Sequence, residues 1–245
     1  ADDGPTTVTD TAGPAITSAQ TITVTSVEVT FSEAVSDATV AGGDFTFSGF
    51  ATGGANAAGA GFDTGAGADD AVVVITLAAE IGDNETGNVA FTAAGVADDA
   101  LANANTQTAT VAVTDGIAAP PTITGYDTAD ADADGQIDRL IVHFDIAVDV
   151  ADGSAADGFP QITLTGGYTI ANADYAAAGI TDLTLTLTES GSPDTAATPD
   201  ATFTNDGDVR DATSAARVPD LGATTVTDGA GPAITSAQTV TVTTV

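Results

Sequence analysis

Residues 130–138 carry the residue types and the spacing of a calcium-binding loop. Carboxylates stand at its first, third, fifth and ninth positions, and Gly135 stands at the sixth, where the chain must turn sharply. Alternate carboxylates in a tight turn point inward, and Ca²⁺ takes about six to eight oxygen ligands. The segment therefore predicts a calcium site made from side chains and one backbone carbonyl, that of Gln136. Its members are Asp130, Asp132, Asp134, Gln136 and Asp138.

One ligand of this loop is missing from the local sequence. An EF-hand loop has a bidentate Glu at its twelfth position, but this chain has Ile141 there. An acid from elsewhere must complete the coordination shell, and Asp127 is the nearest candidate. The alternative is a hydrated acidic turn without an ion, although so many neighbouring carboxylates repel one another unless a cation is present.

Two further sets of acids are weaker metal candidates. Residues 205–211 predict a second metal ion, with Asp206, Asp208 and Asp211 as the acids concerned. The alternative is that the positive charge of Arg210 neutralises these acids. The other set belongs to the ends of the expected domains, where a cation would stiffen the chain. The alternative is that these aspartates only shape turns. This set consists of Asp10, Asp115 and Asp228, with Glu33, Asp98 and Asp99 as acids that the fold can bring to them.

A closing motif recurs along the chain. Val-Thr-Asp, followed shortly by Pro, occurs with its acid at Asp10, Asp115 and Asp228, and residues 2–27 match residues 220–245 at 21 of 26 positions. Thr/Val alternation that ends in Asp, Gly and Pro indicates a strand followed by a stiff turn. Repetition at a fixed spacing indicates an array of units. We therefore expect a segment of a longer chain whose period is 218 residues.

Short strands separated by turn residues predict an all-β fold with little helix. Residues 16–27 predict one strand, and Leu183, Leu185 and Leu187 alternate with threonines as one face of a strand does. An apolar pattern of the first half recurs 113 residues later: Val27, Val29, Phe31 and Val35 become Leu140, Val142, Phe144 and Val148. We expect the end of a preceding repeat (1–13), two β-sandwich domains (14–118 and 119–231) and the first strand of the next repeat (232–245).

The composition limits the partners and the means of stabilisation. The chain has 35 acidic residues against 3 arginines and no lysine, a formal charge of −32, which excludes nucleic acid as a partner because phosphate is repelled. We expect no membrane span in these residues, since no apolar run reaches about 18 residues. Without cysteine or lysine, neither disulfides nor Lys–Asn isopeptide bonds can form. Metal ions and packing remain as means of stabilisation, and the alternative explanation of the acidic charge is adaptation to high salt.

Three features resemble tandem immunoglobulin-like repeats of prokaryotic surface proteins. They are the Phe-Ser-Glu-Ala-Val run at residues 31–35, the acidic loop ahead of the apolar residues 140–144, and the Val-Thr-Asp closures. Such families include S-layer proteins, large calcium-binding adhesins and cell-surface filaments. The resemblance implies Greek-key sandwiches, a location at the cell surface, and calcium ions that rigidify loops and junctions. Because the second domain has Ile146 where the first has Glu33, a role of Glu33 need not transfer.

The sequence favours a structural repeat unit of an extracellular polymer over an enzyme. The units would associate head to tail in a linear array or lattice, either as covalent tandem repeats or through a strand donated to a neighbour. The alternative is a carbohydrate-binding or accessory module of a secreted enzyme from a halophile. That alternative is disfavoured by the absence of Trp, and the strand pattern makes the single histidine, His143, a lone surface residue. Asn84 begins the sequon Asn-Glu-Thr and is a candidate glycan acceptor.

Overall fold

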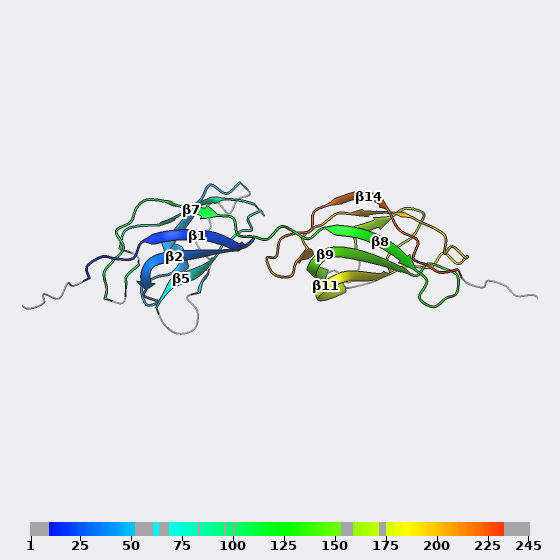
Figure 1. The fold of residues 1–245 in the computed structure, drawn as a ribbon, viewed down its shortest axis with the longest axis horizontal. Helices are drawn as coiled ribbons and strands as arrows, with labels where there is room; N and C mark the ends of the chain where they lie inside the picture. Colours follow the sequence, from blue (N-terminus) through cyan, green and yellow to red (C-terminus); the bar gives the residue numbers. More distant parts are fainter. Residues whose placement is uncertain are drawn as a thin grey trace, which may run out of the picture. The chain divides into compact units, whose positions relative to one another are not determined.

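The chain forms two compact β-rich units, residues 1–119 (unit 1) and 120–245 (unit 2) (Figure 1). The structure is a computed structural model that describes residues 10–51, 61–63, 69–82, 84–95, 97–99, 101–152, 159–171 and 175–232. Within these ranges the helical structure is limited to one 3-10 turn, η1 (Gly42–Asp44), so the predicted all-β fold is confirmed. None of the described helical structure has the length and hydropathy needed to cross a bilayer.

Unit 1 is built on one sheet whose neighbouring strands are antiparallel, except that β1 and β7 run parallel. The order across the sheet is β3-β6-β7-β1-β2-β5-β4. The strands are β1 (Ile16–Thr23), β2 (Ser26–Val35), β3 (Phe45–Ser48), β4 (Gly61–Asp63), β5 (Asp70–Thr76), β6 (Gly87–Phe91) and β7 (Val111–Thr114).

The single strand predicted over residues 16–27 is wrong, because the chain turns at Val24 and Thr25. β1 and β2 form a hairpin in which Thr23 lies opposite Ser26. The amide of Thr25 donates to the hydroxyl of Thr23 (3.2 Å), and Val24 is buried. A threonine hydroxyl thus holds a turn that lacks Gly and Pro, a pattern that alternation alone does not reveal.

The sheet of unit 1 closes on itself around three phenylalanines. The ring centroid of Phe31 on β2 lies 6.0 Å from that of Phe45 on β3 and 6.0 Å from that of Phe91 on β6. β2 is separated from both partners by other strands in the sheet order, so the sheet must curl until its two halves face each other. All three rings are buried, and the result is a two-layered sandwich.

Unit 2 packs two sheets around one apolar core. β10, β12 and β14 form one sheet, and β9 lies at the centre of the other, beside β8, β11 and β13. Leu140 and Leu185 belong to the same buried apolar cluster as Phe203 of the opposite sheet. The eight apolar positions that the 113-residue offset relates are all buried. The strands are β8 (Ile123–Ala129), β9 (Arg139–Asp152), β10 (Ile162–Leu164), β11 (Tyr175–Thr186), β12 (Asp200–Phe203), β13 (Val209–Asp211) and β14 (Leu221–Thr225).

The closing motif lies parallel to the first strand in both units. In unit 1 β7 pairs with β1, and in unit 2 Thr227 forms a parallel bridge with Asp127 on β8. The glycine after the motif's Asp then donates its amide to a threonine hydroxyl of that first strand, from Gly116 to Thr21 (3.0 Å) in unit 1. In unit 2 the same bond runs from Gly229 to Thr128 (3.3 Å). The repeated closing motif therefore links the end of each unit to its first strand.

Candidate metal-binding site

The loop of residues 130–138 joins β8 to β9 and folds around its own carboxylates. Asp130 accepts hydrogen bonds from the amides of Asp134 (3.2 Å) and Gly135 (2.9 Å), and Asp134 accepts one from the amide of Gln136 (2.9 Å). The positive φ of Gly135, 98°, allows the tight reversal that these bonds require. One carboxylate oxygen each of Asp130, Asp132 and Asp134 consequently lies within 4.8 Å of the others. Three of the predicted ligands therefore converge.

Glu189 adds a further carboxylate to this loop, and sequence reasoning missed it. It follows β11, and its carboxylate lies within 4.8 Å of those of Asp132 and Asp138. Asp132 belongs to both groups, so the two groups are continuous. The negative charge of Asp134, together with burial and the charges of Asp132, Asp138 and Asp130, raises the pKa of Glu189 above its ordinary value. A bound divalent cation would relieve this repulsion.

An ion pair and two hydrogen bonds connect the loop to the neighbouring residues of unit 2. Asp138 is buried, and its carboxylate forms an ion pair with Arg139 (3.2 Å). Asp194, from the segment between β11 and β12, accepts the amide of Ile137 (2.8 Å) and donates its own amide to the carbonyl of Gly135 (2.9 Å). Glu189 and Asp194 both come from this segment. It therefore supplies one acid to the site, Glu189, and one residue that holds the loop by hydrogen bonds, Asp194.

Asp127 lies outside these acidic groups and contacts His143 instead. Its carboxylate is 3.0 Å from Nε2 of His143, and the carboxylate of Asp182 is 2.6 Å from Nδ1 of the same ring. The three residues come from β8, β9 and β11, so the imidazole links three strands. His143 points away from the buried Val142 and Phe144, as predicted, and about one third of its side chain is exposed (33%), but it is not isolated, because two carboxylates contact its ring. The hydrogen bond to Asp182 raises the pKa of His143; burial opposes the shift and Asp127 reinforces it.

The raised pKa of His143 predicts that unit 2 loses stability as the pH rises. Stabilisation by the charged ring is complete below the unfolded-state value of 6.5 and disappears as the pH rises through the higher folded-state pKa. Because the pairs are exposed, we expect a loss of about 0.5–1 kcal/mol in the free energy of unfolding. Denaturation at matched ionic strength, followed by tyrosine fluorescence, measures it, since Tyr126, Tyr168 and Tyr175 all belong to unit 2.

His143→Gln should remove most of this pH dependence, and Asp182→Asn should reduce it. The chain has one histidine, so a proton NMR titration of its imidazole gives the folded-state pKa without ambiguity. An NMR value at or below 6.5 would contradict the prediction.

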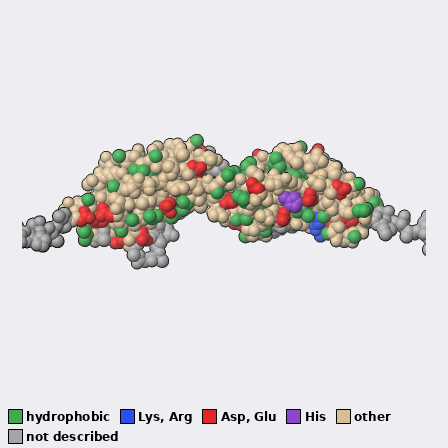
Figure 2. Space-filling model, in the orientation of Figure 1, with side chains coloured by type: hydrophobic (Ala, Val, Ile, Leu, Met, Phe, Trp, Pro, Cys, Tyr) green, Lys and Arg blue, Asp and Glu red, His purple; other side chains and the backbone are tan. Residues whose placement is uncertain are grey.

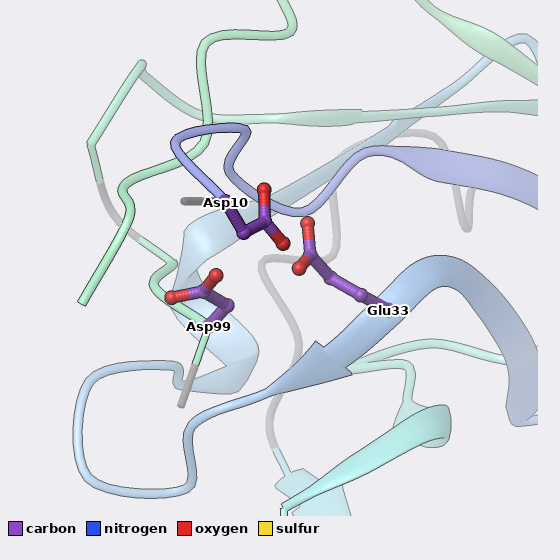
Figure 3. A group of neighbouring side chains, drawn as sticks. All are labelled: Asp10, Glu33 and Asp99. Carbon is purple, nitrogen blue, oxygen red and sulfur yellow. The ribbon is translucent and has the colours of Figure 1, made fainter. Parts of the chain in front are cut away.

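A second acidic group lies at the start of unit 1 (Figure 3). Asp10 precedes β1, Glu33 lies on β2, and one carboxylate oxygen of each lies within 4.8 Å of one from Asp99. Burial, followed by the negative charges of Asp10 and Asp99, raises the pKa of Glu33. The pKa of Asp99 is below its ordinary value, because burial, which would raise it, is outweighed by the hydrogen bonds that its carboxylate forms, chiefly with Asn103. Three of the weaker predicted candidates are thus neighbours in space.

The remaining acids of that set serve as backbone or turn residues. Asp98 forms a backbone bridge with Ala104 and lies outside the acidic groups found among the described residues, as do Asp115 and Asp228. The aspartate of every closing motif accepts a hydrogen bond from the amide two residues further on, the geometry of an Asx turn. These bonds join Asp10 to Ala12 (3.0 Å), Asp115 to Ile117 (3.0 Å) and Asp228 to Ala230 (3.1 Å).

Among the described residues, unit 2 does not repeat the acidic group of unit 1. Ser32 and Asp145 occupy equivalent positions, and the side chain of each accepts a hydrogen bond from the amide that precedes the first strand of its unit. The next residue is Glu33 in unit 1 but Ile146, 40% exposed, in unit 2. The acidic group is therefore specific to unit 1.

The acids of residues 205–211 do not form a single group. The carboxylates of Asp206 and Asp208 both accept hydrogen bonds from Nε2 of Gln161, at 3.0 to 3.2 Å. Asp211 is buried and accepts the hydroxyl of Ser214 (2.8 Å), which shapes the turn that follows β13. Asp206 and Asp208 are therefore drawn together by a residue distant in sequence, whereas Asp211 is not part of their cluster.

The surface of both units is marked by acidic side chains, and arginine is visible in far fewer places (Figure 2). Asn84 of the sequon is exposed and has a positive φ of 62°, typical of a turn tip. The sequon therefore lies in an exposed turn.

No protein-family model and no curated protein sequence matches this chain. Among solved structures it is similar to the N-terminal part of the bacterial S-layer protein SbsC, with a TM-score of 0.36, 15% identity and 74% of this chain covered. It is also similar to S-layer protein rSbsC(31-844), with a TM-score of 0.37, 12% identity and 89% coverage. For surface layer protein SbsC, domains 1-6, the values are 0.37, 13% and 89%. The chain spans 41% of the length of each of these three chains.

Proposed function

We propose that this chain is a structural repeat unit of an extracellular surface polymer and that calcium rigidifies it at two acidic groups. The observation that carries the proposal is the closing segment around Asp10. It is nearly identical in sequence to the segment around Asp228, and it is held against unit 1 by defined contacts. Nδ2 of Asn103 donates to the carbonyl of Asp10 (3.4 Å), and Gly13 lies so close to the carbonyl of Ala104 that no Cβ would fit.

The same contacts supply a model for head-to-tail association. Residues 228–232 repeat residues 10–14 with one substitution, Gly229 for Thr11. A unit of the unit 1 type that follows unit 2 would therefore receive Asp228 as unit 1 receives Asp10, beside counterparts of Glu33 and Asp99. Heterologous contacts of this kind that do not close on themselves generate linear arrays.

Calcium suits the acidic loop of unit 2 because the available donors are hard oxygens. The carboxylates of Asp130, Asp132, Asp134, Asp138 and Glu189 provide them, within the two overlapping groups described above. An orphaned atom also supports an ion. Nε2 of Gln136 donates to Asp134 (2.9 Å), while Oε1 of Gln136 is buried and has no hydrogen-bond partner in the part of the chain that the structure describes. A cation among the acids would favour the opposite orientation of this amide, with its oxygen toward the loop.

The group of Asp10, Glu33 and Asp99 would act at a different place in the polymer. A cation shared by these three carboxylates would tie the closing segment of one domain to β2 and the Asp99 segment of the next. Extracellular calcium sites bind at about 10⁻⁴–10⁻³ M, so such a polymer would stiffen in calcium-rich surroundings and loosen when calcium is withdrawn. A glycan on Asn84 would lie on an exposed turn of this surface coat.

Two experiments on cells that produce the chain test the proposal. Antibodies raised against it should label intact, unpermeabilised cells; labelling that requires permeabilisation would exclude a surface polymer. Denaturing electrophoresis after removal of calcium with EDTA then separates the two forms of array. A very large polypeptide indicates covalent tandem repeats, whereas chains of a single period indicate association by strand donation.

A further inference from the structure

We infer that a domain of the unit 1 type follows unit 2 without a free linker, so that the two domains contact each other directly. The inference rests on the head-to-tail array proposed above. It names the partner that covers the start of unit 1, which is the end of a domain of the unit 2 type. The observation that carries it is that residues 228–232 and their copy, residues 10–14, are held by opposite halves in the two units.

Unit 2 holds the first half of this segment. Ala230 is 8% exposed and belongs to the apolar core of unit 2, and the amide of Gly229 donates to the hydroxyl of Thr128 (3.3 Å). On unit 1 the corresponding residues, Thr11 and Ala12, are both exposed. The one substitution within the segment, Gly229 for Thr11, therefore falls at a position that unit 2 constrains and unit 1 does not.

Unit 1 holds the second half of the segment. Pro14 is buried there, and Gly13 lies so close to the carbonyl of Ala104 that no Cβ would fit. On unit 2 the residue that corresponds to Pro14, Pro232, is exposed. The last two residues of the segment therefore make their contacts with the domain that follows.

The two halves adjoin each other and leave no residue between them. Ala230 contributes to the core of unit 2, and the next residue, Gly231, corresponds to Gly13, which packs against Ala104 in unit 1. Neighbouring Cα atoms are about 3.8 Å apart. A segment that keeps both sets of contacts therefore brings the surfaces of the two domains together.

The link that precedes unit 2 provides a comparison of length. The amide after Pro121 and the amide after Pro14 each donate to a side chain on the second strand of their unit, so the two prolines are equivalent. Asp115 and Pro121 are six positions apart in the sequence, whereas Asp228 and Pro232 are four apart. The link that follows unit 2 is therefore two residues shorter.

Leu101 lies where the preceding domain would make its contact. Among the described large hydrophobic residues it has the greatest exposure, 67%. Its amide donates to the carboxylate of Asp99 (2.8 Å), and Asn103 of the same loop donates to the carbonyl of Asp10 (3.4 Å). A single exposed leucine is common on protein surfaces. This one flanks the segment that arrives from the preceding domain, so we expect the end of a domain of the unit 2 type to bury it.

A chain extended beyond Val245 with a copy of residues 28–119 tests the inference, because the extension completes a second unit 1 after unit 2. The natural sequence has no cysteine, so spin labels can be attached at Thr184→Cys in unit 2 and at Thr46→Cys in the added domain, both exposed strand positions. Pulsed EPR in CaCl₂ should give a narrow distribution of distances. Two alanines inserted between Ala230 and Gly231 should broaden it, because they supply a flexible linker.

The same extended chain contains Leu101 twice, once with unit 2 before it and once without. An uncharged thiol reagent should modify Leu101→Cys several-fold more slowly in the added domain than in the first, and the two-alanine insertion should restore the faster rate. Equal distance distributions with and without the insertion, or equal rates in the two copies, would overturn the direct contact. Either result would leave the proposed surface location intact, since labelling of whole cells tests that separately.

Discussion

Calcium is expected to raise the free energy of unfolding of unit 2 by about 2.7 kcal/mol when the free ion exceeds its dissociation constant a hundredfold. The physical reason is the overlap of two acidic groups at Asp132, whose repulsion already raises the pKa of Glu189. An ion that binds only the folded loop removes this repulsion and so favours the folded state. Urea denaturation with CaCl₂ and with EDTA, followed by tyrosine fluorescence, measures the difference in unit 2 alone.

Substitutions distinguish stabilisation by a bound calcium ion from the general screening of charges by dissolved salt. Asp132→Ala should abolish most of the calcium effect because this residue belongs to both groups, and Asp134→Ala should do the same. Asp37→Asn removes one charge from an exposed position of unit 1 and should leave the effect intact. If NaCl at the same ionic strength stabilised unit 2 as much as CaCl₂, the calcium hypothesis for this loop would have to be abandoned.

Gly229→Ala is expected to destabilise unit 2 by about 3 kcal/mol, at the upper end of the range for overpacking. A Cβ at this position would lie under 3.0 Å from the carbonyl oxygen of Thr128 on β8. That oxygen belongs to the backbone of a paired strand and cannot move without disturbing the ladder with β9. The closing segment would have to leave β8, and with it the hydrogen bond from Gly229 to Thr128 would be lost.

Gly222→Ala is the matched control for this prediction. Gly222 lies on β14 of the same unit, and a Cβ there would meet nothing within 4 Å. We expect Gly222→Ala to be neutral or slightly stabilising, because alanine loses less backbone entropy on folding. Equal stabilities of the two variants in urea denaturation would show that the closing segment tolerates displacement from β8.

Much of the fold could be predicted because it depends on local patterns. Alternation in β2, β9 and β11 identifies buried faces, and Asp, Gly and Pro mark where units close. The hairpin at Val24 and Thr25 could not be predicted, since a Thr23 hydroxyl replaces the usual turn residues. The curling of unit 1 around Phe31 also depends on contacts between strands that are far apart in the sheet order.

Some residues of the candidate sites could likewise be predicted from the local sequence, and others could not. Asp130, Asp132 and Asp134 converge because their spacing and Gly135 dictate it, so the sequence is sufficient for them. Glu189 and Gln161 come from distant segments that only the completed sandwich brings near, and no local signal marks them. The pairing of Asp127 with His143 likewise depends on the register between β8 and β9.

The parallel pairing of β1 with β7 has a mechanical consequence for a chain under tension. Force that enters a unit at the start of β1 and leaves at the end of β7 pulls two parallel strands in opposite directions along their length. Their hydrogen bonds are then loaded together in shear, rather than opened one at a time from an end. The bridge between Asp127 and Thr227 gives unit 2 the same geometry. Resistance to pulling is governed by the rate of unfolding, so this topology suits a thread that must bear load between a cell and its surroundings.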